Sequence, residues 1–252
     1  MEAGKKYADS PVWEQLSGRR ILLMGVKSPL KQSFLQNLSH MGTQMGGEFQ
    51  VVEDPAEIRE GDLIFLFGLT RESGFEAWKE IQSLWQVFRF LEGKEFEAAA
   101  LVTGTEVYGK LYGKLYGKER AIREEEMGYV SHLLKQDTAP FCMRTAENLA
   151  GRLAREKGLP IKILRTVRNW EDTVSDTVVA EGVAGAFGSP IQRLIQGAVT
   201  ALLLGKAGEA YNLPWEEISF EEEPESRSPL SPVIVKPDTR KLERLGKDAA
   251  AG

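Results

Sequence analysis

Cysteine and histidine are almost absent from this sequence, which contains only Cys142, His40 and His132 of these two types. A single cysteine cannot form an internal disulfide, and this usage is typical of a protein from a reducing compartment. The two histidines have no metal-ligand spacing with the cysteine, so we expect no metal site. We interpret Cys142 as a small buried hydrophobic residue and not as a nucleophile.

Long apolar segments and an excess of basic charge are also missing. The most apolar run, residues 63–67 (LIFLF), has the length of a strand, whereas a membrane-spanning helix needs about 20 apolar residues. The N-terminal residues are not followed by the apolar run of a signal peptide. A net charge of −5 and a pI near 5.4 argue against a general nucleic-acid or membrane-surface binder. We therefore predict a cytoplasmic protein with no nucleic-acid or membrane partner.

What the sequence does contain is an alternation of short apolar runs and amphipathic segments. Hydrophobic residues make up 42% of the 252 residues, enough for a sizeable core. Residues 75–91 carry apolar side chains every three or four positions, which predicts a helix, and Ser28 followed by proline predicts the start of an earlier one. The remaining segments are predicted as strands at 20–24, 49–52, 62–67, 98–102 and 161–164 and as helices at 144–157 and 191–204. This alternation favours a parallel sheet covered by helices.

Five short motifs follow one another in an order that resembles a known family. They are residues 103–109 (TGTEVYG), 146–150 (AENLA), 158–165 (GLPIKILR), 208–213 (GEAYNL) and 238–246 (DTRKLERLG). The order is similar to that of the extended short-chain dehydrogenase/reductases, the NAD-dependent epimerases and dehydratases of nucleotide sugars. The resemblance implies a Rossmann-like doubly wound parallel sheet with a small C-terminal substrate lobe. It implies an NAD(P)-binding-type domain over residues 1–165 and a substrate-type lobe with a C-terminal tail over residues 166–252.

The expected cofactor turn is residues 25–31 (GVKSPLK), between the first strand and the first helix. A dinucleotide-binding turn needs glycines that let backbone amides approach the pyrophosphate. Gly25 is retained, whereas Ser28 and Lys31 stand where the second and third glycines are expected. Glu53, or Asp54 beside it, is the candidate acidic residue for the adenosine ribose. The degenerate turn predicts that no cofactor is bound, with NAD(P) as the cofactor if the site still functions.

The catalytic residues that the family would use are missing at the aligned positions. The family relies on a tyrosine base, a lysine four residues later that lowers its pKa, and a Ser/Thr hydroxyl. Aligned on residues 146–147, the tyrosine position is Ala139, the lysine position is Met143 and the Ser/Thr position is Gly104. Thr105 could serve after a shift of one residue, and Tyr129 could be a relocated base, although it has no lysine four residues later.

The resemblance also places two residues near the sugar. Tyr108 belongs to the first motif, and Arg165 follows its strand at a position that the family places below the sugar site. The Arg165 guanidinium could bind a nucleotide phosphate as a fork, or it could tie the two lobes together through a carboxylate. The sequence leaves these two roles open.

Two further features concern surfaces. The helices at 75–91 and 144–157 correspond to the pair that forms the family's dimer, and their large aromatic side chains could supply an apolar interface. The tetrapeptide repeat of residues 107–118 (VYGKLYGKLYGK) could stack on nucleic-acid bases. We favour an exposed loop for the repeat, because the chain is acidic and glycine at every fourth residue disfavours a helix.

Three hypotheses for the function follow. The leading one is a degenerate family member without its own redox catalysis, acting as a non-catalytic partner or regulatory subunit of an active epimerase or dehydratase. The second is an active nucleotide-sugar epimerase or dehydratase that uses Thr105 and Tyr129. The third is a nucleotide-sugar binding module whose ligand lies near Arg165 without reacting.

Overall fold

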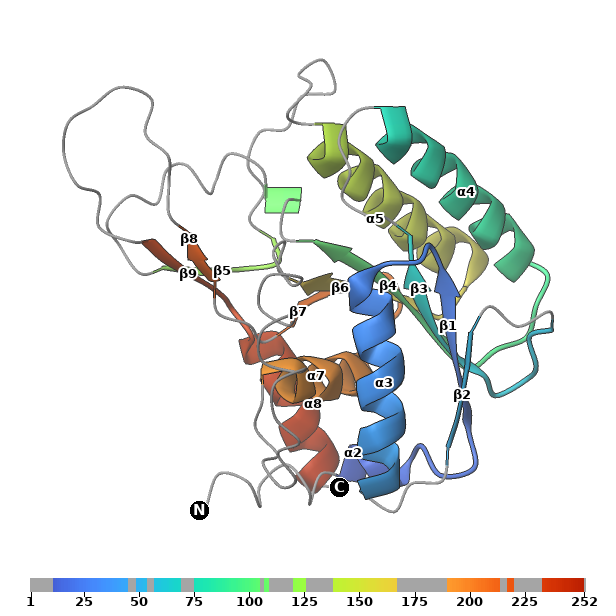
Figure 1. Ribbon diagram of the computed structural model, residues 1–252, viewed down its shortest axis with the longest axis vertical. Helices are drawn as coiled ribbons and strands as arrows, with labels where there is room; N and C mark the ends of the chain where they lie inside the picture. The colour runs from blue at the N-terminus through green and yellow to red at the C-terminus, as the bar shows by residue number, and fades with distance from the viewer. Residues whose placement is uncertain are drawn as a thin grey trace.

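A computed structural model describes residues 11–44, 49–53, 57–68, 75–104, 107–108, 120–125, 138–166, 190–213, 217–219 and 233–251. Helices and strands alternate through most of these ranges (Figure 1). In chain order they are α2 (Pro11–Glu14), β1 (Arg20–Gly25), α3 (Pro29–Gln44), β2 (Gln50–Glu53), β3 (Leu63–Phe67), α4 (Phe75–Leu91), β4 (Ala98–Gly104), β5 (Arg120–Ile122), α5 (Thr138–Lys157), β6 (Ile161–Thr166), α7 (Pro190–Leu204), β7 (Ala210–Asn212), β8 (Glu217–Ser219), β9 (Val233–Pro237) and α8 (Arg240–Ala251).

The main sheet has six strands in the order β2-β1-β3-β4-β6-β7, and all neighbours are parallel. β1 lies between β2 and β3, so successive strands are added on one side of β1 up to β2 and on its other side from β3 onward. The carboxyl ends of β1 and β3 therefore form the topological switch point, where ligands bind in open α/β sheets. The predicted Rossmann-like doubly wound parallel sheet is confirmed.

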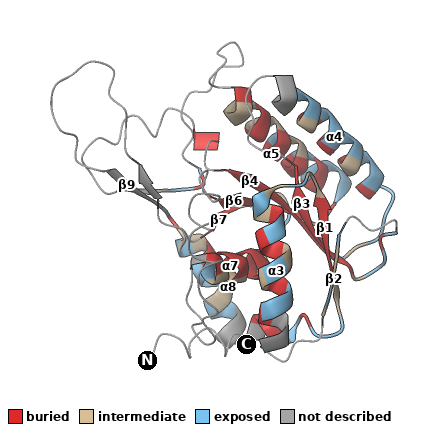
Figure 2. Ribbon diagram, in the orientation of Figure 1, coloured by how far each residue is buried: buried red, intermediate tan, exposed pale blue. Residues whose placement is uncertain are grey.

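Helices cover both faces of this sheet, as Figure 1 shows. α3 and α7 lie on one face, with α2 and α8 packed beside α7, and α4 and α5 lie side by side on the other. Two hydrophobic clusters result, one on each side of the sheet, and β3, β4 and β6 between them are buried (Figure 2). β3 and β4 are consequently buried at every residue, the pattern expected of strands in a parallel sheet.

The local signals in the sequence act as expected. Ser28 caps α3, because its Oγ accepts a hydrogen bond of 3.2 Å from the Lys31 amide. α5 ends at Lys157, and Gly158 follows with a φ of 69°, the left-handed conformation that commonly terminates a helix. The helix predicted over 75–91 is α4 with the same bounds.

A second, three-stranded sheet lies beside the main sheet, next to β7 (Figure 1). It consists of β5, β9 and β8, with β5 parallel and β8 antiparallel to β9. The predicted division at 165/166 does not follow the two sheets. β5 comes from the first segment but pairs with β9, whereas α7 and β7 come from the second segment and belong to the main sheet and its core.

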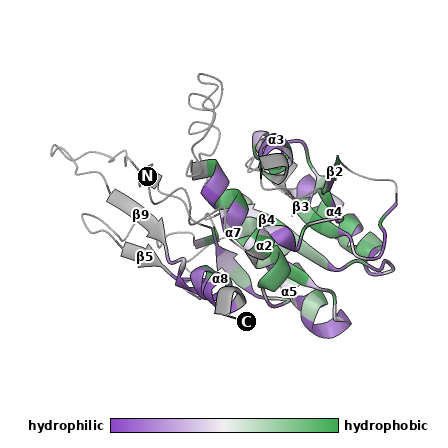
Figure 3. Ribbon diagram, turned by 90° about the horizontal axis from the view of Figure 1, so that it is seen from below, coloured by the Kyte–Doolittle hydropathy of each residue, from purple (hydrophilic) through white to green (hydrophobic). Residues whose placement is uncertain are grey.

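Hydropathy follows the same layering. β3 and β4 are mostly hydrophobic in Figure 3, whereas α8 is mostly hydrophilic. No helix in the described ranges is both long and apolar enough to cross a membrane.

Candidate functional site

The turn between β1 and α3 lies at the switch point. Gly25 ends β1 with a φ of 105°, and a Cβ built on it would lie 2.2 Å from the Phe67 carbonyl oxygen. The Val26 amide donates a hydrogen bond of 2.8 Å to that same oxygen. Glycine is therefore required here both for the backbone conformation and for the close approach of β1 to β3.

The helix side of this turn differs from a dinucleotide-binding turn. The Lys31 side chain is only 1% exposed, and its Nζ lies 3.4 Å from the Gly25 carbonyl oxygen. The same Nζ lies 3.4 Å from Oε1 of Glu53 at the end of β2. Of the predicted cofactor residues, the structure thus brings Gly25, Ser28 and Glu53 to one edge of the sheet. Ser28 caps the helix, and Glu53 is paired with a lysine.

A cavity of about 170 Å³ lies beside this turn, on the face of the sheet that α4 covers. Residues from two strands and one helix line it: Met24 and Gly25 of β1, Leu66 and Phe67 of β3, and Leu84 and Val87 of α4. This lining is apolar, so the cavity suits an apolar or aromatic group and not a phosphate.

The tyrosine and lysine of the family are absent from α5. Met143, at the lysine position, is 1% exposed and packs inside the molecule, and Ala139 is half-buried. The whole of α5 contains no tyrosine, and its only lysine, Lys157, is its last residue. α5 therefore offers no pair that could hold a phenolate base beside an ammonium.

The Ser/Thr position lies at the end of β4. Gly104 is paired in register with Thr166 of β6, whose buried Oγ1 has no hydrogen-bond partner among the described residues. Thr103, one residue earlier, donates a hydrogen bond of 2.7 Å to Glu147. Thr105 and Tyr129, the candidate shifted catalytic residues, lie outside the described residues.

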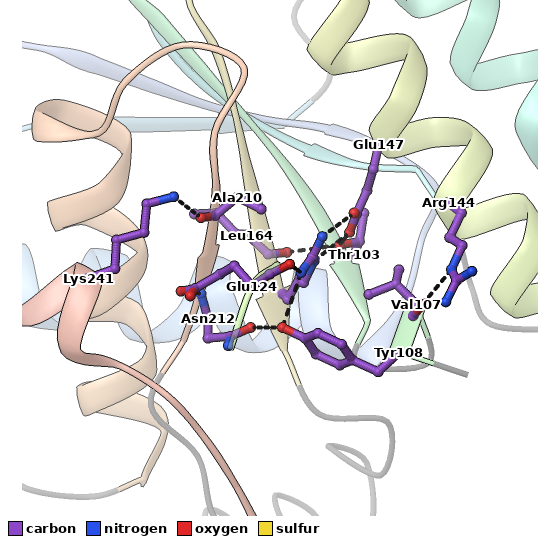
Figure 4. Close-up of polar contacts among 11 residues, drawn as sticks. Thr103, Val107, Tyr108, Glu124, Arg144, Glu147, Leu164, Ala210, Asn212 and Lys241 are labelled. Atoms are coloured by element: carbon purple, nitrogen blue, oxygen red, sulfur yellow. Dashed lines mark hydrogen bonds and ion pairs between the residues drawn. The ribbon is translucent and has the colours of Figure 1, made fainter. Parts of the chain in front are cut away.

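Next to these positions lies a buried ion pair, shown in Figure 4. Arg165 Nε donates to Glu147 Oε1 at 3.0 Å, and NH2 donates to Oε2 at 2.7 Å. The carboxylate also accepts the Thr103 hydroxyl, so all three donors converge on one acceptor group. Glu147 comes from α5, whereas Thr103 and Arg165 are register partners on β4 and β6. The pair thus fixes α5 to the carboxyl end of the sheet.

Three more residues complete this network (Figure 4). Arg165 NH1 donates to the Tyr108 hydroxyl at 3.1 Å and to the Glu124 carbonyl oxygen at 2.8 Å. The Tyr108 hydroxyl in turn donates to Asn212 Oδ1 at 2.5 Å, and the backbone amide of Asn212 donates to Glu124 Oε1 at 3.0 Å. Because Asn212 is the register partner of Arg165 on β7, the network extends across three strands.

Burial and charge both act on the titratable members of this network. Burial alone would lower the pKa of Arg165, but the charge and hydrogen bonds of Glu147, and then those of Tyr108, raise it above its ordinary value. Burial raises the pKa of Tyr108, although the neighbouring Arg165 opposes the shift. Burial also raises the pKa of Glu124, against the hydrogen bond from Asn212. Tyr108 is therefore a neutral hydrogen-bonding group at neutral pH and not a base.

The two roles left open for Arg165 can now be compared. Its guanidinium is 3% exposed and donates four hydrogen bonds within the protein. This geometry favours pairing with a carboxylate over the phosphate fork, because a phosphate would have to displace a bidentate carboxylate. The carboxylate is that of Glu147, so the pair joins α5 to β6 within the predicted first domain and does not tie the two predicted lobes together. Tyr108, the other predicted substrate-binding residue, is buried and has both hydroxyl functions occupied by Asn212 and Arg165.

Sequence reasoning did not identify four members of this network as site residues. Glu147 entered only as an alignment landmark, and Thr103, Glu124 and Asn212 were not proposed as site residues. The usable signal was the buried charge itself, because an arginine directly after an apolar strand requires a carboxylate partner. Which carboxylate that is depends on how α5 packs on the sheet. Of the tetrapeptide repeat, residues 109–118 lie outside the described part of the chain.

Comparisons with known proteins agree on the fold. The sequence matches no protein-family model, and no curated protein sequence matches it. Among solved structures, RMD from Pseudomonas aeruginosa in complex with NADPH is 12% identical, with a TM-score of 0.51 and 77% of each chain covered. DesIV, a dTDP-glucose 4,6-dehydratase from Streptomyces venezuelae with NAD bound, is 14% identical, with a TM-score of 0.52, 77% of this chain and 75% of that chain covered.

A UDP-galactose 4-epimerase gives similar values: 13% identity and a TM-score of 0.51, with 77% of this chain and 76% of that chain covered. These structures are nucleotide-sugar enzymes or hold a nicotinamide cofactor. At such identities the likeness establishes the fold that the resemblance implied, and not the activity.

Proposed function

We propose that this protein is a degenerate member of the extended short-chain dehydrogenase/reductases that has lost its own redox catalysis. It would act as a non-catalytic partner or regulatory subunit in nucleotide-sugar metabolism. The observation that carries the proposal is α5, where a buried methionine and a half-buried alanine stand at the positions of the lysine and the tyrosine. The retained network around Arg165 and Glu147 supports it, because the architecture of the site persists without its base.

The altered cofactor turn supports the same proposal. Lys31 occupies the helix side of the turn, and Pro29 removes an amide that could face a phosphate. Under this proposal the protein carries no NAD(P) and acts in the cytoplasm, a reducing compartment of which its single cysteine is typical.

Turnover of nucleotide sugars tests the proposal directly. Purified protein is incubated with UDP-galactose, UDP-glucose or dTDP-glucose and added NAD or NADP, and the products are separated by chromatography. An active UDP-galactose 4-epimerase serves as the control for the assay. We expect no conversion above the blank. Conversion that disappears in Tyr129→Phe and Thr105→Ala variants would overturn the proposal in favour of an active enzyme with shifted residues.

An exposed aromatic pair on α4 supports the partner role. Trp78 and Trp85, seven residues apart on the helix, are 39% and 40% exposed, and the Trp78 ring lies 5.6 Å from that of Phe141 on α5. Large exposed aromatic side chains are enriched at protein interfaces. We propose that this outer face of α4 and α5 binds either a second copy of the chain or the active enzyme subunit.

Sedimentation analysis tests the interface. A Trp85→Lys variant should shift the protein toward monomer, or abolish co-sedimentation with an active epimerase subunit. Phe90→Lys is the matched control, because Phe90 is 41% exposed on the same helix but five residues from Trp85, on a different side. Equal behaviour of the two variants would argue against this face.

A nucleotide-sugar binding module is the second candidate, and two observations favour it. The apolar cavity at the switch point can take a ring, and the Thr166 hydroxyl is buried at the same edge of the sheet without a partner among the described residues. Binding of UDP- or dTDP-sugars without turnover would raise the melting temperature through linkage. Absence of a shift with any of these sugars would count against the module.

A further inference from the structure

The Lys31 side chain lies in an unusual position for a lysine in the first turn of a helix. It is almost completely buried, and its Nζ lies 3.4 Å both from the Gly25 carbonyl oxygen and from Glu53 Oε1. The ammonium thus bridges the carboxyl ends of β1 and β2. Glu53, in contrast, has a side chain that is 45% exposed.

The two partners of this pair are held very differently. An ammonium group removed from water needs a counter-ion, so Lys31 depends on the nearby carboxylate. The Glu53 side chain is 45% exposed, and its contact is longer than a good charged hydrogen bond. Glu53 can therefore turn into solvent, whereas the buried Lys31 remains where it is. Its ammonium then lacks this counter-ion, and an incoming anion can take the place of the carboxylate.

The surroundings of Lys31 favour an incoming anion. α3 begins at this turn, so the partial positive charge of its N-terminus adds to the charge of the ammonium. The Glu53 carboxylate lies against the same ammonium and would repel a phosphate placed there. The acidic residue that a dinucleotide site would direct at the ribose is here turned onto the lysine of the turn.

We propose that the Lys31–Glu53 ion pair is an autoinhibitory contact, in which Glu53 occupies the cationic side of the β1–α3 turn and excludes phosphate-bearing ligands until it moves into solvent. The inference goes beyond the proposed function, because it concerns access of anions to the turn and requires neither a sugar nor a partner.

Calorimetric titration with inorganic pyrophosphate tests the contact in the full-length protein. Glu53→Gln removes the competing charge while leaving Lys31 in place, and we expect its dissociation constant to be about tenfold lower than that of the parent. Glu60→Gln is the matched control, because Glu60 is also exposed and precedes β3, at the opposite edge of the sheet. It should bind pyrophosphate like the parent protein.

The double variant Glu53→Gln/Lys31→Met identifies the group that receives the anion, and the gain in affinity should disappear in it. Equal affinity of Glu53→Gln and Glu60→Gln would overturn the proposal, and so would a gain that persists in the double variant. If the double variant does not fold, as judged by circular dichroism, the pyrophosphate affinities of Glu53→Gln and Glu60→Gln still test the proposal. Turnover is not measured, so failure here is distinct from failure of the proposed function.

Discussion

Arg165 and Glu147 form a bidentate ion pair that is almost completely excluded from solvent, with nitrogen–oxygen distances of 3.0 and 2.7 Å. The pair joins the carboxyl end of β6 to the middle of α5. The Thr103 hydroxyl donates to Glu147, and Arg165 donates to the Tyr108 hydroxyl. The hydrogen bonds of both side chains are made to other groups of the protein, so this buried cluster holds α5 against the sheet.

Removing one partner of this pair should be costly. Arg165→Met leaves the Glu147 carboxylate buried without its counter-ion, and we expect the free energy of unfolding to fall by about 3–5 kcal/mol. The double variant Arg165→Met/Glu147→Leu should cost less than the sum of the two single variants, because neither charge is then left alone. Urea unfolding of the four proteins measures this coupling. Additive single effects would show that the two side chains act independently.

The Tyr108 hydroxyl should contribute to stability and not to proton transfer. Tyr108→Phe removes the donor to Asn212 and the acceptor for Arg165, both in buried surroundings. We expect a loss of about 1–3 kcal/mol in the free energy of unfolding, the usual effect of leaving buried polar groups unsatisfied. Because burial raises the pKa of Tyr108, no tyrosinate absorbance from this residue should appear below pH 10. A tyrosinate signal near neutral pH that vanishes in Tyr108→Phe would contradict this structural role.

Glu124 makes the stability depend on pH. Burial raises the pKa of this carboxyl in the folded state, so its contribution to stability is greatest below its ordinary pKa of 4.5 and is lost as the pH rises through the folded value. A glutamine here still offers an oxygen to the Asn212 amide. Glu124→Gln should therefore gain stability relative to the parent between pH 4.5 and pH 7, measured by urea unfolding. Glu125→Gln, an exposed neighbour, should not show this trend.

Alanine substitutions at Gly25 and Gly61 distinguish the cost of a positive φ from the cost of a steric collision. Both have such a φ, 105° and 81°, but a Cβ at Gly25 would collide with the Phe67 carbonyl oxygen, whereas one at Gly61 would meet no atom within 4 Å. Gly61→Ala should lower the free energy of unfolding by about 1–2 kcal/mol through backbone strain alone. Gly25→Ala should lower it by at least about 3 kcal/mol, because β1 and β3 must also separate. Equal losses in thermal unfolding would show that the close approach at the switch point is not needed.

The Cys142 thiol should be unreactive in the folded protein. It is fully buried on α5, and burial, followed by the charge of Glu80, raises its pKa from 9.0 to about 11. This rise alone lowers the thiolate fraction at pH 8 about 100-fold. A thiol reagent such as dithionitrobenzoate should therefore react with Cys142 at least about 100-fold more slowly in the folded protein than in urea. Rapid labelling of the folded protein would show that α5 opens readily.

Parts of this structure follow from local sequence alone. The helix at 75–91 and the strand at 63–67 were predicted within one residue, because an apolar repeat of three or four residues, or an uninterrupted short apolar run, specifies the element and its buried face. The cap at Ser28 and the glycine stop at Gly158 follow from chemistry within a few residues. α8 was not predicted, because its sequence (RKLERLGKDAAA) is strongly charged and has few apolar residues. Leu242 and Leu245 pack against the core.

The sequence by itself determined the class of fold, the position of the turn between β1 and α3, and the absence of a tyrosine–lysine pair from α5. Each of these depends on residues that are near one another in the chain, or on residues that are simply missing. Only the tertiary structure decided that Arg165 binds Glu147, that Lys31 binds Glu53, and that β5 pairs with β9 across the predicted boundary. These contacts join residues 18 or more positions apart, so the packing of helices on the sheet selects the partner, and a local pattern carries no information about which partner it will be.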